Sequence, residues 1–129
     1  MSFPFPCRSR AVIGVVHLPA LPGSPGHQLS RSQIMDHALT DAEALIAGGV
    51  SGIIIENFGD APFYPEEVPK STIADMTVIV QSITARSSSI PIGVNVLRND
   101  ASAALAIAAA CNSSFIRVNV HTAAMLTDQ

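Results

Sequence analysis

Residues 92–96 read Ile-Gly-Val-Asn-Val, and residues 116–120 repeat this pattern as Ile-Arg-Val-Asn-Val, with four of the five positions identical. Short runs rich in β-branched residues predict strands that are buried on both faces. An asparagine inside such a run needs a hydrogen-bond partner. The repeat favours two equivalent strands of a repeated βα unit over the alternative that two buried strands merely share Val and Ile.

Similar apolar runs and helical periodicity extend this pattern along the chain. Ser30 is the expected N-cap of the first helix, Gly48-Gly49 its end, Ser71 the cap of the second helix, and Asn99 or Asp100 the cap of an Ala-rich third helix. Strands are expected at 11–16, 52–55, 92–96 and 115–120, and helices at 31–47, from 71 to the serines at 87–89, and up to Ala110. The order βαβαβαβ predicts a parallel sheet with right-handed crossovers.

The expected fold is α/β, the N-terminal half of a TIM-type (β/α)8 barrel with parallel strands. A complete barrel needs about 250 residues, and this chain of 129 residues would stop near the midpoint. Residues 1–10 are expected to form an N-terminal extension, and residues 11–129 the partial barrel domain. An open doubly wound sheet is the alternative, but residues 21–26 carry no GxGxxG turn for a dinucleotide.

Composition excludes several classes of partner. The formal net charge is −3, and the seven Lys and Arg residues are scattered, so no basic stripe is available for nucleic acid. The longest apolar stretch, residues 103–111, is much shorter than the roughly 20 residues of a membrane-spanning helix. No secretory signal is recognised at the start, and we expect a cytoplasmic protein. Cys7 and Cys111 match no metal or redox spacing, and no motif identifies a cofactor.

Polar residues follow each expected strand, at the edge where ligands gather in parallel α/β folds. Glu56 follows the wholly apolar run 53–55, so its carboxylate is expected to be partly buried and suited to acid–base chemistry or to a cation. His17 ends the first strand and is the second candidate catalytic residue. The candidate ligand-binding residues lie at the ends of the later strands and are Asn57, Asn95, Arg98, Arg117, Asn119 and His121.

Each candidate also has a structural alternative. Asn95 and Asn119 could hydrogen-bond each other across neighbouring strands, or they could face a ligand. Arg117 shares the strand parity of Asn119, and an ion pair with Glu56 is favoured over a phosphate or carboxylate anchor. His17 could simply hydrogen-bond its own loop.

A metal site is not assigned. His17, Glu56 and His121 could converge on an ion, but one histidine per strand is weaker than a metal-binding spacing on one element. No Walker A motif, GxSxG turn or Cys–His pairing is present.

Five blocks of sequence closely resemble the BtpA family: residues 12–25, 41–50, 52–63, 91–100 and 115–122. The resemblance implies a barrel of the ribulose-phosphate-binding type. The family is named for a factor in photosystem I biogenesis, thought to act from the membrane surface, so peripheral membrane association is also implied. Some members are labelled nucleoside triphosphatases, but the family supplies no settled mechanism, and whether this chain is an enzyme stays open.

Two hypotheses for function follow. In one, a photosystem I biogenesis or stability factor uses the barrel as a binding scaffold. In the other, a barrel enzyme or binder takes a small phosphorylated metabolite or a nucleoside at the strand ends. Family members continue through the second half of the barrel, so the fragment alone is expected to be inactive. Open edge strands are also expected to make it self-associate.

Overall fold

The computed structural model describes residues 10–87 and 90–122 of the chain. Along this part of the chain, strands and long helices alternate in the predicted order, with one short 3₁₀ helix after the second strand. The elements are β1 (Ile13–His17), α1 (Arg31–Ala47), β2 (Gly52–Glu56), η1 (Phe58–Asp60), α2 (Lys70–Arg86), β3 (Ile92–Asn95), α3 (Ala101–Cys111) and β4 (Phe115–Ile116). Apart from Arg10, the predicted N-terminal extension lies outside the described residues.

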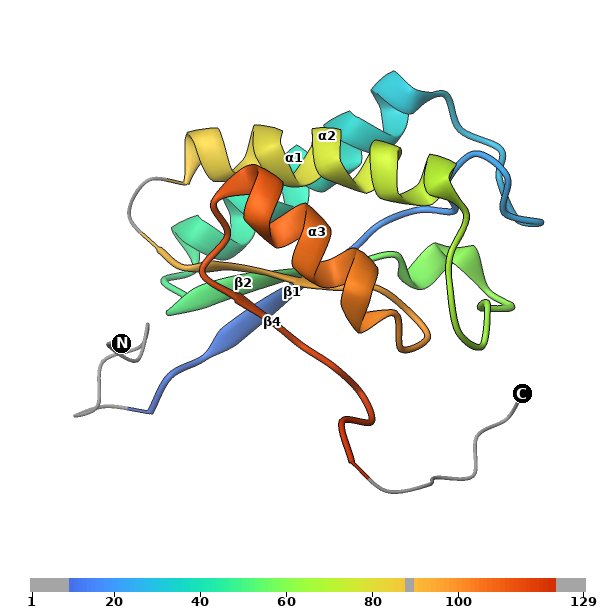
Figure 1. Cartoon of the computed structure of the whole chain (residues 1–129). Coiled ribbons are helices and arrows are strands. Elements are labelled where there is room, and N and C mark those ends of the chain that lie inside the picture. Colours follow the sequence, from blue (N-terminus) through green and yellow to red (C-terminus); the bar gives the residue numbers. More distant parts are fainter. Residues whose placement is uncertain (1–9, 88–89, 123–129) are drawn as a thin grey trace.

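The four strands form one parallel sheet in the sequential order β1-β2-β3-β4. Figure 1 shows α1, α2 and α3 on the same side of this sheet. In a doubly wound sheet the strand order reverses and helices cover both faces. Sequential parallel strands with helices on one side are the arrangement of half a (β/α)8 barrel, and this fold prediction is confirmed.

The helix-covered face of the sheet holds the hydrophobic core. Val16, Ile53, Ile55 and Val94 are fully buried there and pack with apolar side chains of all three helices. From α2, the core takes Met76, Ile79, Val80 and Ile83. Within the part of the chain that is described, no helix is both long and apolar enough to cross a lipid bilayer.

The second face of the sheet carries the polar side chains. Paired residues of parallel strands point to the same side, and the register pairs His17 with Glu56 and Glu56 with Asn95. Gly93 pairs with Phe115 on this face. A side chain at Gly93 would collide with the Phe115 ring, so glycine lets that ring lie against the sheet.

Helix α1 begins and ends as the sequence predicted. Ser30 accepts a hydrogen bond from the Gln33 N–H, and the Gln33 side chain accepts one from the Ser30 N–H. This reciprocal capping box satisfies two of the donors that a helix start leaves unpaired. Gly49, just past the end, has a φ of 80°, a conformation that glycine adopts without strain.

The predicted ends of β1, β2 and β3 differ from the structure by one or two residues, and two further predicted details are wrong. Ser71 does not cap α2, because the helix begins one residue earlier, after Pro69; the fixed φ of proline suits a helix start. The fourth strand covers only Phe115–Ile116 rather than residues 115–120. Beyond it, the backbone of Val120 pairs with the Asn99 side chain instead of a strand.

Candidate functional site

Glu56 is the centre of the polar cluster at the C-terminal ends of the strands. Its side chain follows three buried isoleucines of β2, and the residue is only 4% exposed. The Oε1 atom accepts hydrogen bonds from Arg117 Nη1 at 2.9 Å and from Asn95 Nδ2 at 3.0 Å. The buried carboxylate is therefore held in one orientation by a cation and an amide. The ion pair between Arg117 and Glu56, favoured from the sequence, is present.

Asn95 links Glu56 to Asn119. Its Nδ2 donates to Glu56 and also to Asn119 Oδ1 at 3.3 Å, so the hydrogen bond between the two asparagines, one of the two alternatives left open from the sequence, is formed. Asn119 in turn donates to the backbone oxygen of Arg98 at 3.0 Å. Asn95 Oδ1 is buried and has no hydrogen-bond partner among the described residues. Such a group in a native fold calls for an explanation.

His17 lies on the other side of Glu56. Its Nε2 atom is 3.6 Å from Glu56 Oε2, beyond hydrogen-bond distance. The imidazole stacks on the ring of Phe58, with centroids 4.3 Å apart and planes 17° apart. Phe58 was missed by sequence reasoning, although an aromatic residue two positions after Glu56 marks the same edge of the sheet. It is 52% exposed, so it adds an apolar surface beside the carboxylate.

Asn57 is a structural tie between strand ends. Its Oδ1 accepts from the Leu97 N–H at 2.7 Å, and its Nδ2 donates to Asp60 Oδ2 at 3.1 Å and to Leu97 O at 3.4 Å. Asp60 Oδ1 accepts from the Leu21 N–H at 2.7 Å. Both side chains are buried. Asn57 thus joins the loops that follow β1, β2 and β3, and no atom of it is directed to a ligand by this geometry.

The remaining two candidates lie at the margin of the cluster. The Arg98 guanidinium lies over the ring of Phe63, 5.3 Å from its centroid, a cation–π distance. His121 is exposed, and no hydrogen bond or ion pair joins it to residues 10–87 or 90–122. The structure therefore brings together Glu56, Asn95, Arg117, Asn119 and His17, and leaves His121 apart. In the same described ranges, no three His, Cys, Asp or Glu side chains lie close enough together to hold a metal ion.

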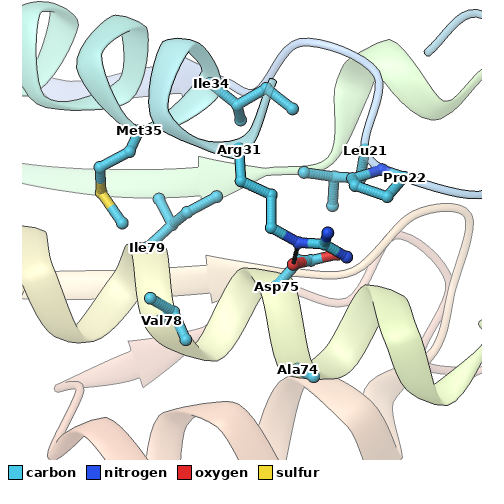
Figure 2. Close-up of a pocket in the computed structure, with 9 residues that line it drawn as sticks. All are labelled: Leu21, Pro22, Arg31, Ile34, Met35, Ala74, Asp75, Val78 and Ile79. Carbon is cyan, nitrogen blue, oxygen red and sulfur yellow. Dashed lines mark hydrogen bonds and ion pairs between the residues drawn. The ribbon is translucent and has the colours of Figure 1, made fainter. Parts of the chain in front are cut away.

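A separate hollow of about 260 Å³ lies between α1 and α2. Figure 2 shows apolar side chains around it, with Arg31 and Asp75 joined across it. Arg31 Nε donates to Asp75 at 2.6 Å, and this hydrogen bond and the carboxylate charge raise the pKa of Arg31. Both charges are thus paired with each other. None of the predicted site residues lines this hollow, so the strand-end cluster is the better candidate.

Fold and site together define the class of protein: half of a parallel (β/α)8 barrel with a buried, oriented carboxylate at the C-terminal ends of its strands. The sequence profile of the BtpA family matches residues 8–129. The chain belongs to the BtpA family.

Relatives of this chain occur in archaea and cyanobacteria. It is 48% identical over 121 residues to an uncharacterized protein of Pyrococcus abyssi, an alignment that covers 94% of this chain and 46% of the relative. It is 54% identical over 110 residues to an uncharacterized protein of Archaeoglobus fulgidus, with coverage of 85% and 44%. It is 49% identical over 118 residues to the photosystem I biogenesis protein BtpA of a Synechocystis species, with coverage of 92% and 41%.

The chain spans slightly less than half the length of these curated relatives. No solved structure matches it significantly. Family membership therefore comes from sequence, and the arrangement of the site comes from the geometry described above.

Proposed function

We propose that the whole protein binds a small molecule at the C-terminal ends of its strands, with Glu56 as the central contact. The observation that supports this proposal is the difference between the two oxygens of the Glu56 carboxylate. One oxygen is anchored by Arg117 and Asn95, while the other accepts no hydrogen bond within residues 10–87 and 90–122. A buried carboxylate with a fixed orientation and an unused oxygen is suited to receive a hydrogen bond or a proton from a ligand.

The proposal gives the neighbouring residues separate roles. Glu56 would act as the acid–base group, and His17, 3.6 Å from it, is the second group able to exchange protons with a bound molecule. Asn95, Arg117 and Asn119 would hold the carboxylate and border the ligand. Arg98 would contribute positive charge at the margin, which suits a phosphorylated metabolite or a nucleotide-like compound.

A titration followed by nuclear magnetic resonance tests the proposal. The labelled chain is titrated with a panel of sugar phosphates, nucleosides, polyols and amines, and backbone amides of residues 56, 57 and 95–97 are monitored. At least one compound is expected to give saturable shifts there. Glu56→Gln should abolish these shifts while far-UV circular dichroism stays unchanged. The matched control is Glu43→Gln, since Glu43 is an exposed residue of α1 paired with Arg86.

The same titration is run on a full-length relative such as the Archaeoglobus fulgidus protein; if no compound shifts the corresponding amides in either protein, or if Glu56→Gln binds as the unmodified chain does, small-molecule binding at this site is rejected. Both outcomes are readable in the same spectra. Glu43 is exposed on α1 and contacts Arg86 rather than the strand-end residues. Its substitution therefore reports only the effect of losing one negative charge.

A second candidate function is a role in photosystem I biogenesis or stability, with the barrel as a scaffold for a protein partner. It is favoured by the 49% identity with the Synechocystis protein of that name. Complementation of a cyanobacterium that lacks this relative tests it. Under the scaffold hypothesis, the chain and its Glu56→Gln variant restore photosystem I equally. If neither restores it, the scaffold role is rejected for this chain.

A further inference from the structure

We propose that the group recognised at Glu56 is a neutral hydroxyl, and that the ligand class is a polyol or sugar. This inference rests on the proposed function, because it specifies the chemistry of the molecule that the same site would bind. It is drawn from the balance of donors, acceptors and charges around two side chains on neighbouring strands.

The first step is that two acceptor atoms, one of them fully buried, receive no hydrogen bond from the described residues. Glu56 Oε2 accepts no hydrogen bond from the described residues, and His17 Nε2 lies 3.6 Å from it. Asn95 Oδ1 is likewise unpartnered in a residue that is 1% exposed. A carboxylate oxygen and an amide oxygen each have two lone pairs. What the site lacks is therefore a hydrogen-bond donor.

The second step is that rotating the amide cannot correct this imbalance. Oxygen and nitrogen of an asparagine are assigned from the hydrogen-bond network. Asn95 Nδ2 faces Glu56 Oε1 and Asn119 Oδ1, both of which are acceptors. Exchanging the two atoms would place an oxygen against two oxygens, so Nδ2 must stay where it is. The unpartnered acceptor is then a fixed property of the site.

The third step concerns position and access. Glu56 and Asn95 are paired in register on β2 and β3, so their side chains lie on the same face of the sheet. Asn95 Oδ1 is enclosed by protein, so a hydroxyl reaches it only after a neighbouring side chain moves. Glu56 Oε2 is therefore the first contact.

The fourth step uses charge to choose among donors. An anion such as phosphate would meet two acceptor oxygens and be repelled. A cation would approach a carboxylate that Arg117 already pairs at 2.9 Å, and it would have to be stripped of water beside the guanidinium. A neutral hydroxyl supplies the missing donor without adding charge. A phosphate elsewhere on the ligand remains compatible with this arrangement.

The fifth step is the apolar surface next to the carboxylate. Phe58 is 52% exposed, and its ring is stacked with His17, directly beside Glu56. Sugars and polyols have C–H faces that pack against an exposed aromatic ring while their hydroxyls bond to polar groups. Hydroxyl acceptors and an aromatic surface in one place suit this class of ligand better than a small ion.

Three simple probes test the inference: xylitol as the neutral polyol, inorganic phosphate as the anion and ethylammonium as the cation. Each is titrated into the labelled chain, and the backbone amides of residues 56 and 57 and the Asn95 side-chain amide are followed. Xylitol is expected to give saturable shifts at these positions, and the two ions none. Glu56→Gln should weaken xylitol binding about tenfold or more, whereas Glu43→Gln should leave it unchanged.

Phe58→Ala provides a second variant if Glu56→Gln fails to fold, because Phe58 is half exposed and outside the core. It should weaken xylitol binding about threefold or more. Saturable shifts with phosphate or ethylammonium but not xylitol would overturn the ligand class and leave the proposed function standing. The ligand class would also be overturned if xylitol gave no shifts while another neutral compound of the panel bound in a way that Phe58→Ala weakens and Glu56→Gln does not. If no compound binds, both proposals fail.

Discussion

Asp100 joins the start of α3 to the segment that precedes α2, and its removal is a sharp test of how the strand-end loops are held. Its Oδ1 accepts from the Ala103 N–H at 2.8 Å, and its Oδ2 accepts from the Val68 N–H at 2.9 Å. The residue is 6% exposed. Asp100→Ala therefore removes a helix cap and leaves a buried N–H unpaired in one change.

The expected loss of stability follows from these two contacts. Loss of the cap costs about 1 kcal/mol, and the unpaired Val68 N–H costs about 1–3 kcal/mol. Asp100→Ala should thus lower the free energy of unfolding by about 2–4 kcal/mol. Asp100→Asn keeps an oxygen for the Ala103 N–H but turns an N–H toward Val68, so its loss should be smaller, at about 1–3 kcal/mol.

Urea denaturation followed by far-UV circular dichroism measures these differences. Equal slopes of unfolding free energy against urea for all variants are required for the comparison. The matched control is Asp36→Ala, an exposed position of α1, expected to change stability by no more than about 0.5 kcal/mol. If Asp100→Ala unfolds at the same urea concentration as the control, the two hydrogen bonds do not stabilise the loops as argued.

Three further outcomes are expected. Gly93→Ala should lower the free energy of unfolding by about 1–3 kcal/mol, because its Cβ meets the Phe115 ring. This loss, measured by calorimetry, should be smaller in a Phe115→Leu background. Equal losses in the two backgrounds would refute the contact. In the folded Cys7→Ser variant, the Cys111 thiol should react with a disulfide reagent about tenfold more slowly than in the same variant unfolded in denaturant, because burial raises its pKa. Equal rates in the two states would contradict the burial of this thiol. The chain should sediment as an oligomer, because β1 and β4 end the described sheet without further pairing; a stable monomer would argue against this.

The sequence was sufficient for the fold because each local signal agreed with the others. Periodicity, the Ser30 cap and the glycine pair defined α1 with the same bounds that the structure has. The apolar runs gave the strands, and their alternation with helices gave the parallel order. The prediction of a helix start was wrong where two residues close together could both begin a helix. The helix α2 begins after Pro69, so Ser71 lies inside it and does not cap it.

The fourth strand shows why the repeated motif was only a partial guide. The register pairs Val94 with Ile116, so the two Ile-x-Val-Asn-Val runs are offset by two residues rather than aligned. An even offset keeps both asparagines on the same face, which is why they still meet. The strand nevertheless ends at Ile116, and at Val120 the side-chain amide of Asn99 takes both hydrogen bonds of the backbone.

The residues of the site could be predicted from the sequence, but the separate role of each residue could not. Glu56, Asn95 and Arg117 could be grouped because they end neighbouring strands, and they do meet. Asn57 follows a strand in the same way, yet its amide is used up by Leu97 and Asp60. No sequence pattern separates an amide that ties loops together from one that faces a ligand. That difference depends on which backbone groups the loops leave unpaired.

The hydrogen bonds of Asn57 also affect its susceptibility to deamidation. Spontaneous deamidation would convert its Nδ2 into a carboxylate oxygen, facing Asp60 Oδ2 and the Leu97 carbonyl that now accept from it. Three acceptors would then face one another in a buried place, and the two hydrogen bonds that Asn57 Nδ2 donates would be lost. The same hydrogen bonds and the burial of Asn57 restrict the rotation of its side chain that deamidation requires. The exposed Asn112 has no such protection, so deamidation in stored protein should appear at Asn112 before it appears at Asn57.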